Sequence, residues 1–150
     1  MRVQKFAVVA FAFLAGTSLA SADQPLTKQD AVTMVKEAVA TIKAVGPEKA
    51  YAEIDHGKFR KGSLYVIVQG FNGVTLAHAT NPKLIGKDLS GAQDIDGRFF
   101  VRDMTALAKK GQPFWYAFKF VNPVTKKIEI KDSYCEPLND TRVCAGLYRS

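Results

Sequence analysis

The sequence predicts an α+β fold in which an N-terminal helix packs on a five-stranded antiparallel sheet. Apolar residues recur at helical spacing up to about residue 57, whereas segments rich in β-branched and aromatic residues dominate from Leu64 onward. Helices followed by runs of strands are typical of α+β domains, in which the sheet is antiparallel. One long connection, over residues 79–99, separates the second and third expected strands and is placed where it can roof a pocket.

The first 22 residues have the composition of a secretory signal peptide. Arg2 and Lys5 precede an apolar run over residues 6–15, and small residues follow up to Ala22. These are the n-region, h-region and cleavage site of such a leader. The apolar run is shorter than the roughly 20 residues that a spanning helix needs. We therefore expect cleavage before Asp23, one exported domain over residues 23–150, no membrane span after cleavage, and a periplasmic or secreted location.

Two helices are expected at the start of the exported chain. Thr27 and Asp30 have the spacing of a capping box, with Asp in the place of Glu. Apolar residues then recur at intervals of three and four: Val32, Val35, Val39 and Ile42. The Gly-Pro pair at residues 46 and 47 ends this helix, and a second, short helix is expected from Pro47 to Gly57.

The remaining segments predict five strands and one more helix. The segments "SLYVIVQ" and "VTLAH" flank Asn72-Gly73, which is the strongest short-range signal for a hairpin. After the connection, "GRFFVRDMTALAKKG" is expected to be helical with Gly111 as its C-cap. Three further strands are "FWYAFKFV", "KIEIKDSYC" and "RVCAGLY". Helices on one face and a loop with a short helix on the other predict a PAS-like sandwich.

The polar residues give little support for catalysis or metal binding. His56 and His78 share no metal-ligand spacing, and the chain has neither a G-x-S-x-G motif nor a Gly-rich phosphate loop. Asp94 and Asp96, before Gly97, are interpreted as a turn and helix N-cap. We therefore expect no enzyme, no metal and no cofactor.

The net charge is positive, with 21 Lys and Arg against 14 Asp and Glu. Basic surfaces bind nucleic acid in some proteins, but these residues are scattered in short groups and an exported chain seldom meets nucleic acid. Small anions or anionic envelope surfaces are the favoured partners. The two cysteines, Cys135 and Cys144, flank eight residues rich in turn formers. Since disulfides persist outside the cytoplasm, we expect these cysteines to be bonded.

Aromatic and polar residues on the expected strands suggest a binding pocket. Alternate residues of a strand face opposite sides, so the strand at 114–121 carries aromatics on both faces. One face can cover the helices while the other lines a cavity, although ordinary core packing is the alternative. Lys131 is either a solvated lysine or an anion ligand, and His78 either fixes the loop or contacts a ligand. The candidate ligand contacts are Tyr65, His78, Phe100, Trp115, Tyr116, Lys131 and Tyr134.

Five segments in order resemble the single Cache domain of the second type, an extracytoplasmic sensor module of bacterial chemoreceptors and histidine kinases. They are "LYVIVQGFNGVTLAH", "NPKLIGKDL", "DIDGRFFVRDM", "NPVTKKIEIKDSY" and "VCAGLY", and the resemblance covers about residues 27 to 149. Where the family pattern has His-Pro this chain has His78-Ala79, and Phe118 stands in a tyrosine place. The resemblance implies a PAS-like fold and recognition of a small carboxylate.

We therefore expect a small-molecule-binding sensory protein that recognises a small organic acid and acts with a membrane chemoreceptor or histidine kinase. The alternative is an envelope interaction module that modulates a membrane sensor without a ligand, which a sealed and fully packed cavity would favour. An enzyme is the third and least supported hypothesis.

Overall fold

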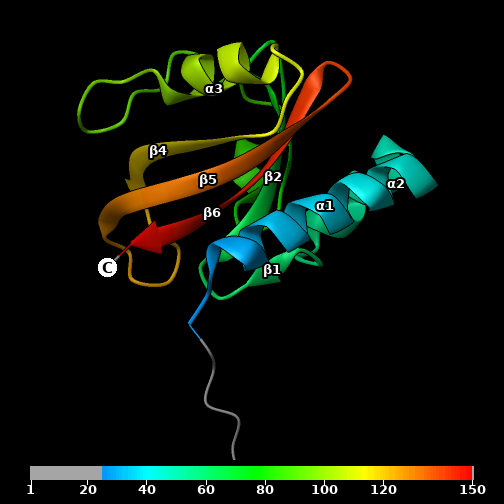
Figure 1. Cartoon of the computed structure of the whole chain (residues 1–150), viewed down its shortest axis with the longest axis horizontal. Coiled ribbons are helices and arrows are strands. Elements are labelled where there is room, and N and C mark those ends of the chain that lie inside the picture. The colour runs from blue at the N-terminus through cyan, green and yellow to red at the C-terminus, as the bar shows by residue number, and fades with distance from the viewer. Residues whose placement is uncertain (1–24, 150) are drawn as a thin grey trace, which may run out of the picture.

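Two helices cover one face of the sheet in the computed structural model, which describes residues 25–149 (Figure 1). Helix α1 spans Lys28–Val45 and α2 spans Pro47–Asp55. The predicted capping box is present, with the Asp30 carboxylate accepting from the Thr27 amide at 2.8 Å. The predicted signal peptide lies outside the described residues. Within residues 25–149, no helix combines the length and apolar character needed to cross a membrane.

The sheet is antiparallel throughout, and the predicted five-stranded sheet is confirmed. Its strands are β2 (Leu64–Gly70), β3 (Thr75–His78), β4 (Phe114–Val121), β5 (Ile128–Leu138) and β6 (Thr141–Arg149). The order is β3-β2-β6-β5-β4, so the C-terminal strand lies in the middle. A sixth strand that the sequence did not predict, β1 (Arg60–Lys61), pairs with the start of β2.

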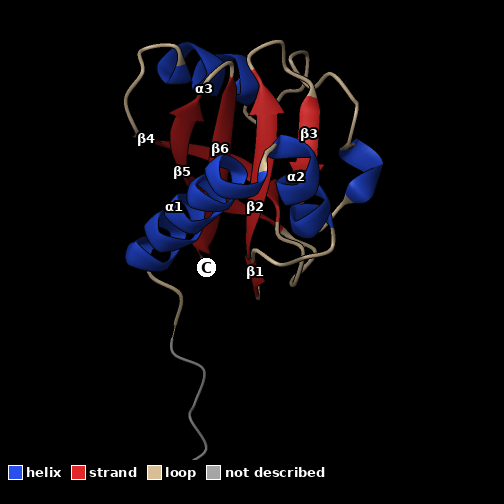
Figure 2. Cartoon of the chain, turned by 90° about the vertical axis from the view of Figure 1, so that its right-hand side faces the viewer, coloured by secondary structure: helices blue, strands red, loops and turns tan. Residues whose placement is uncertain are grey.

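The opposite face of the sheet carries the connection between β3 and β4 (Figure 2). This connection contains a 3-10 turn, η1 (Pro82–Leu84), and helix α3 (Phe100–Ala108). Apolar side chains accordingly form two clusters, one under α1 and α2 and one between α3 and the sheet. The predicted layer of loop and short helix over the sheet is therefore confirmed.

Asp94 fixes the connection to the sheet edge. Its carboxylate accepts from the backbone amides of Asp96 and Arg98, pairs with the Arg98 guanidinium at 2.7 Å, and accepts from the amide of Lys119 on β4. The predicted turn is present. The predicted N-cap is wrong, because α3 begins at Phe100 and its N-cap residue is Phe99.

Candidate ligand-binding site

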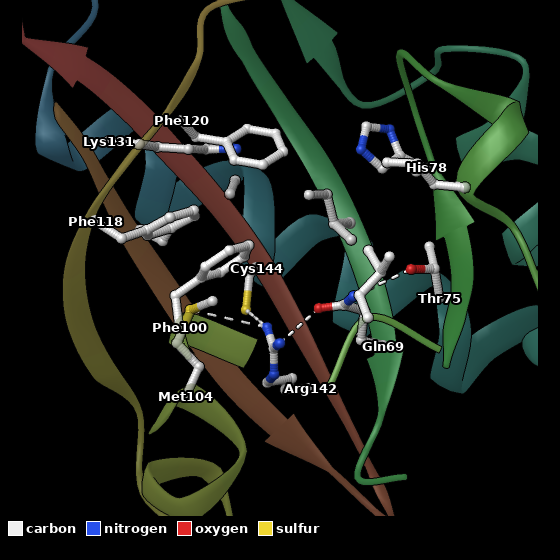
Figure 3. Close-up of a pocket in the computed structure, with 15 residues that line it drawn as sticks. Gln69, Thr75, His78, Phe100, Met104, Phe118, Phe120, Lys131, Arg142 and Cys144 are labelled. Carbon is white, nitrogen blue, oxygen red and sulfur yellow. Dashed lines mark hydrogen bonds between the residues drawn. The ribbon is translucent and has the colours of Figure 1, made fainter. Parts of the chain in front are cut away.

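A cavity of about 40 Å³ lies between the sheet and the α3 layer (Figure 3). On this measure, which counts only the space open to the centre of a water, one water needs about 10–15 Å³, so the cavity has room for a small organic molecule. Its walls are Ile67, Gln69, Thr75, His78, Leu84, Leu89, Phe100, Met104, Phe118, Phe120, Lys131, Ser133, Arg142, Cys144 and Ala145. None of these residues is acidic.

The pleat of the strands decides which side chains reach the cavity, because alternate residues point to opposite faces. Lys131 and Ser133 of β5 therefore share a face, as do Arg142 and Cys144 of β6. On β3 the alternation is interrupted by a bulge. Val68 pairs with residue 77 but Gln69 pairs with Thr75, so one residue of β3 has no partner. This bulge brings both Thr75 and His78 to the cavity side, although they are three residues apart.

Lys131 is a buried cation in the cavity wall. Only 1% of its surface is exposed, and its Nζ lies 3.9 Å from the ring centre of Tyr65 and 5.3 Å from that of Tyr148. A glycine makes this placement possible, because a Cβ on Gly146 would come within 2.6 Å of the Lys131 Cε. The interpretation of Lys131 as a solvated lysine is therefore wrong. Burial alone would raise the pKa of the Tyr65 hydroxyl, but the positive charge of Lys131 and the hydrogen bonds with Lys131 and Tyr148 together outweigh burial and lower this pKa.

His78 fixes the loop and keeps one ring nitrogen free. Its Nδ1 accepts from the backbone amides of Thr80 and Asn81, at 3.3 and 3.0 Å. An acceptor at Nδ1 requires the proton of the neutral ring to be on Nε2, which is then a donor. Burial, with a smaller contribution from the charge of Lys131, lowers the pKa of His78 to about 4. The ring is therefore neutral at neutral pH and can donate toward the cavity (Figure 3).

Arg142 is a second buried cation, also 1% exposed. Its Nη2 donates to the Gln69 Oε1 at 2.5 Å, and its Nη1 lies 3.3 Å from the Cys144 sulfur and 3.9 Å from that of Met104 (Figure 3). Within the described part of the chain, neither Arg142 nor Lys131 forms a salt bridge. The positive charge of the cavity is thus not balanced by its walls.

The Cys144 sulfur that Arg142 contacts belongs to the predicted disulfide. Cys135 and Cys144 lie directly opposite each other on β5 and β6 and are bonded, so the disulfide prediction is confirmed. Among residues 25–149, no group of His, Cys, Asp and Glu side chains is arranged to hold a metal ion.

An outer groove adjoins the cavity. Its walls include Tyr65, Asn81 and Lys126, and it shares His78, Leu84 and Phe120 with the cavity. These three shared side chains form the boundary between the cavity and the groove. The groove therefore gives a short route by which a small solute can reach the cavity when they move.

The structure brings together three of the seven candidate contacts, His78, Phe100 and Lys131, in the cavity wall. Tyr65 borders it through its ring under Lys131. Tyr116 lies on the cavity face of β4 but is bound to α3 through a hydrogen bond to Asp103, outside the cavity wall.

The other two candidates, Trp115 and Tyr134, are on the opposite face of the sheet. They lie directly across from each other on β4 and β5, with ring centres 5.3 Å apart, and Lys28 of α1 lies over the indole. The expectation that Tyr134 shares a pocket with Lys131 does not agree with this placement, because residues three apart on a regular strand face opposite sides.

Several cavity residues were missed by sequence reasoning. Arg142 and Gln69 are the most important of them, and Phe118, Phe120, Thr75 and Met104 also contribute. The alternation of strand faces could have identified some of these residues. Phe118 and Phe120 are two residues apart and therefore share a face of their strand. Arg142 comes directly before Val143, so it faces the side opposite to that apolar residue. No pattern in the sequence indicates the bulge that turns Thr75 toward the cavity.

Comparison with known proteins agrees with this geometry. The family model described as single Cache domain 2 matches residues 2–143. A methyl-accepting chemotaxis protein from Vibrio parahaemolyticus is similar in structure with a TM-score of 0.71 at 20% identity, covering 81% of this chain and 87% of that one. No curated protein matched the chain.

Two further solved structures are similar over 81% of this chain. One is described by the words "carboxylic acid recognition by a Cache chemosensory domain", with a TM-score of 0.67, 23% identity and 92% of its own chain covered. The other is the periplasmic sensor domain of a chemotaxis protein, with a TM-score of 0.64, 22% identity and 90% covered. At these identities the solved structures show a shared fold, while the family model covers most of the sequence. The chain belongs to the single Cache domain 2 family.

Proposed function

We propose that this protein is a periplasmic or secreted sensor that binds a small organic acid in the cavity under α3. One observation carries the proposal: the Lys131 ammonium is buried in a cavity whose wall contains no carboxylate. An isolated buried charge is costly unless a counter-charge joins it. A ligand carboxylate supplies that charge and accepts a charge-assisted hydrogen bond.

The rest of the wall suits such a ligand. The Nε2–H of His78 is available as a second donor, because Nδ1 is already occupied by two backbone amides. Phe100 and Phe118 stack with their ring centres 4.4 Å apart and offer an apolar surface to the hydrocarbon part of the acid. A few placed polar groups in a mostly apolar wall are typical of small-molecule sites. The description of one structural neighbour as recognising a carboxylic acid points the same way.

The location and the partner follow from the same reasoning. A disulfide and an expected signal peptide favour an oxidising compartment outside the cytoplasm. Sensors of this family are found in chemotaxis proteins, so a membrane chemoreceptor or histidine kinase is the partner that we propose. The described residues bind the signal, and the partner transmits it.

A thermal-shift screen of the protein from Asp23 onward tests the proposal. Small mono- and dicarboxylic acids are compared with amino acids and neutral aromatics at equal ionic strength. A ligand present at 100 times its dissociation constant stabilises the folded protein by about 2.7 kcal/mol. Stabilisation by an acid but not by its amide supports the anion site, whereas no stabilisation by any acid would refute it.

A second candidate is an interaction module that acts without a ligand. One observation favours it, since Val121, Ile128 and Ile130 are exposed apolar residues on the edge strand β4 and its neighbour β5, where a partner can pack. The first proposal is favoured because the side chains around the cavity do not pack it closed. If no compound in the screen stabilises the protein and the protein binds a membrane sensor, the second candidate function would be established.

A further inference from the structure

The cavity contains two buried cations at opposite ends. Figure 3 shows Lys131 and His78 at one end and Arg142 with Gln69 at the other, with Cys144 between them. Both cations are 1% exposed and neither forms a salt bridge among the described residues. A ligand carboxylate at Lys131 therefore balances one of these charges and leaves the positive charge of Arg142 in the same cavity.

Arg142 is bound only by neutral groups. Its acceptors are the amide oxygen of Gln69 and the sulfurs of Met104 and Cys144, and its buried Nε–H has no partner. Sulfur is a weak acceptor. Burial lowers the pKa of Arg142 to about 10, so the guanidinium is still charged at neutral pH. A buried guanidinium that keeps its proton at neutral pH and has no carboxylate partner is suited to an anion from outside the chain.

The two cations lie beside neighbouring same-face positions of β6. The Cε of Lys131 lies against Gly146, and the Nη1 of Arg142 lies beside Cys144. Gly146 and Cys144 are two residues apart on the same face of β6, which corresponds to roughly 7 Å. This distance is short enough for a small molecule with an acidic group at each end.

We propose that the natural ligand is a short dicarboxylic acid, with one carboxylate at Lys131 and His78 and the other at Arg142. This inference rests on the proposed function and narrows its ligand class. The apolar side chains between the two ends contact the carbon chain. A monocarboxylic acid of the same length balances one charge only, so Arg142 distinguishes the two classes of acid.

Isothermal titration calorimetry of matched pairs tests the inference, with malonate against propionate and succinate against butyrate. We expect at least one dicarboxylate to bind about ten- to a hundredfold more tightly than its monocarboxylate partner, the effect of one hydrogen bond to a charged group. Arg142→Met should remove this preference, because the variant has no charge at that end of the cavity to bind the second carboxylate. Arg102→Met, which removes an exposed arginine from α3, is the matched control and should keep the preference.

The possible outcomes separate the inference from the proposed function. Equal binding of both members of every pair by the unmodified protein would overturn the dicarboxylate inference and leave the acid site intact. Binding of neither class would refute the proposed function as well. Because the unmodified protein already decides between the two classes, the test stands even if Arg142→Met does not fold. A preference that survives in folded Arg142→Met would also overturn the role of Arg142.

Discussion

Replacing His78 with asparagine should remove a specific part of the pH dependence of stability. Asparagine keeps an acceptor, Oδ1, for the amides of Thr80 and Asn81, which now donate to the His78 Nδ1. It has no proton to gain in the acid range. The substitution therefore preserves the loop contact while it removes the titration.

The magnitude follows from the pKa of His78, which burial and the charge of Lys131 lower from 6.5 to about 4. Between these two values the unfolded chain binds a proton that the folded protein does not. The histidine therefore contributes its full stability above pH 6.5 and loses it as the pH falls toward 4. One pKa unit corresponds to about 1.4 kcal/mol, so the loss is about 3 kcal/mol.

Denaturant unfolding at pH 7.5, 6.5, 5.5 and 4.5 measures this effect as the difference in free energy of unfolding between the unmodified protein and His78→Asn. We expect the free energy of unfolding of the unmodified protein to fall relative to that of His78→Asn toward acid pH, because only the unmodified protein loses the histidine contribution. His56→Asn is the control, since His56 is not buried in the core and its substitution leaves the loop contact in place. Parallel pH curves for the unmodified protein and His78→Asn would refute the reasoning.

Two more predictions concern the sheet. Gly146→Ala places a methyl group 2.6 Å from the Lys131 Cε, so we expect a loss of about 1–3 kcal/mol in denaturant unfolding and weaker acid binding. Gly91→Ala, where no atom lies within 4 Å, is its control, and equal effects of the two would contradict the close packing. Replacing Cys135 and Cys144 together with alanine opens a short loop and should cost about 2–3 kcal/mol; an unchanged unfolding midpoint would contradict it.

Much of the fold could be predicted because local signals agreed with the tertiary structure. The capping box at Thr27, the Gly-Pro break after α1 and the Asn-Gly turn each act over a few residues, and each is present in the structure or marks an element boundary there. The strand segments are rich in residues that favour strands whatever their partners. The strand order is not local, since the C-terminal strand β6 enters between β2 and β5.

The site was only partly predictable from the sequence, because successive residues of a strand point to opposite faces of the sheet and only one face lines the cavity. Lys131 and Tyr134 both have suitable chemistry, but they are three residues apart and point to opposite faces. A prediction that considered which residues share a face with Lys131 would have excluded Trp115 and Tyr134 from the pocket and included Phe118. It would have failed on β3, where a bulge changes the face midway along the strand. Residue type therefore indicates a ligand site less well than residue type combined with face.

The affinity of Lys131→Met for an acid found in the screen tests the central claim most directly. Methionine fills a similar volume without the charge, so folding should change little. Loss of a hydrogen bond to a charged group should weaken binding by about 1.5–3 kcal/mol, roughly ten- to a hundredfold in the dissociation constant. Lys36→Met, on the exposed side of α1, is the matched control and should bind as the unmodified protein does. If calorimetry shows that Lys131→Met binds the acid as tightly as the unmodified protein, Lys131 does not hold the ligand and the proposed site is wrong.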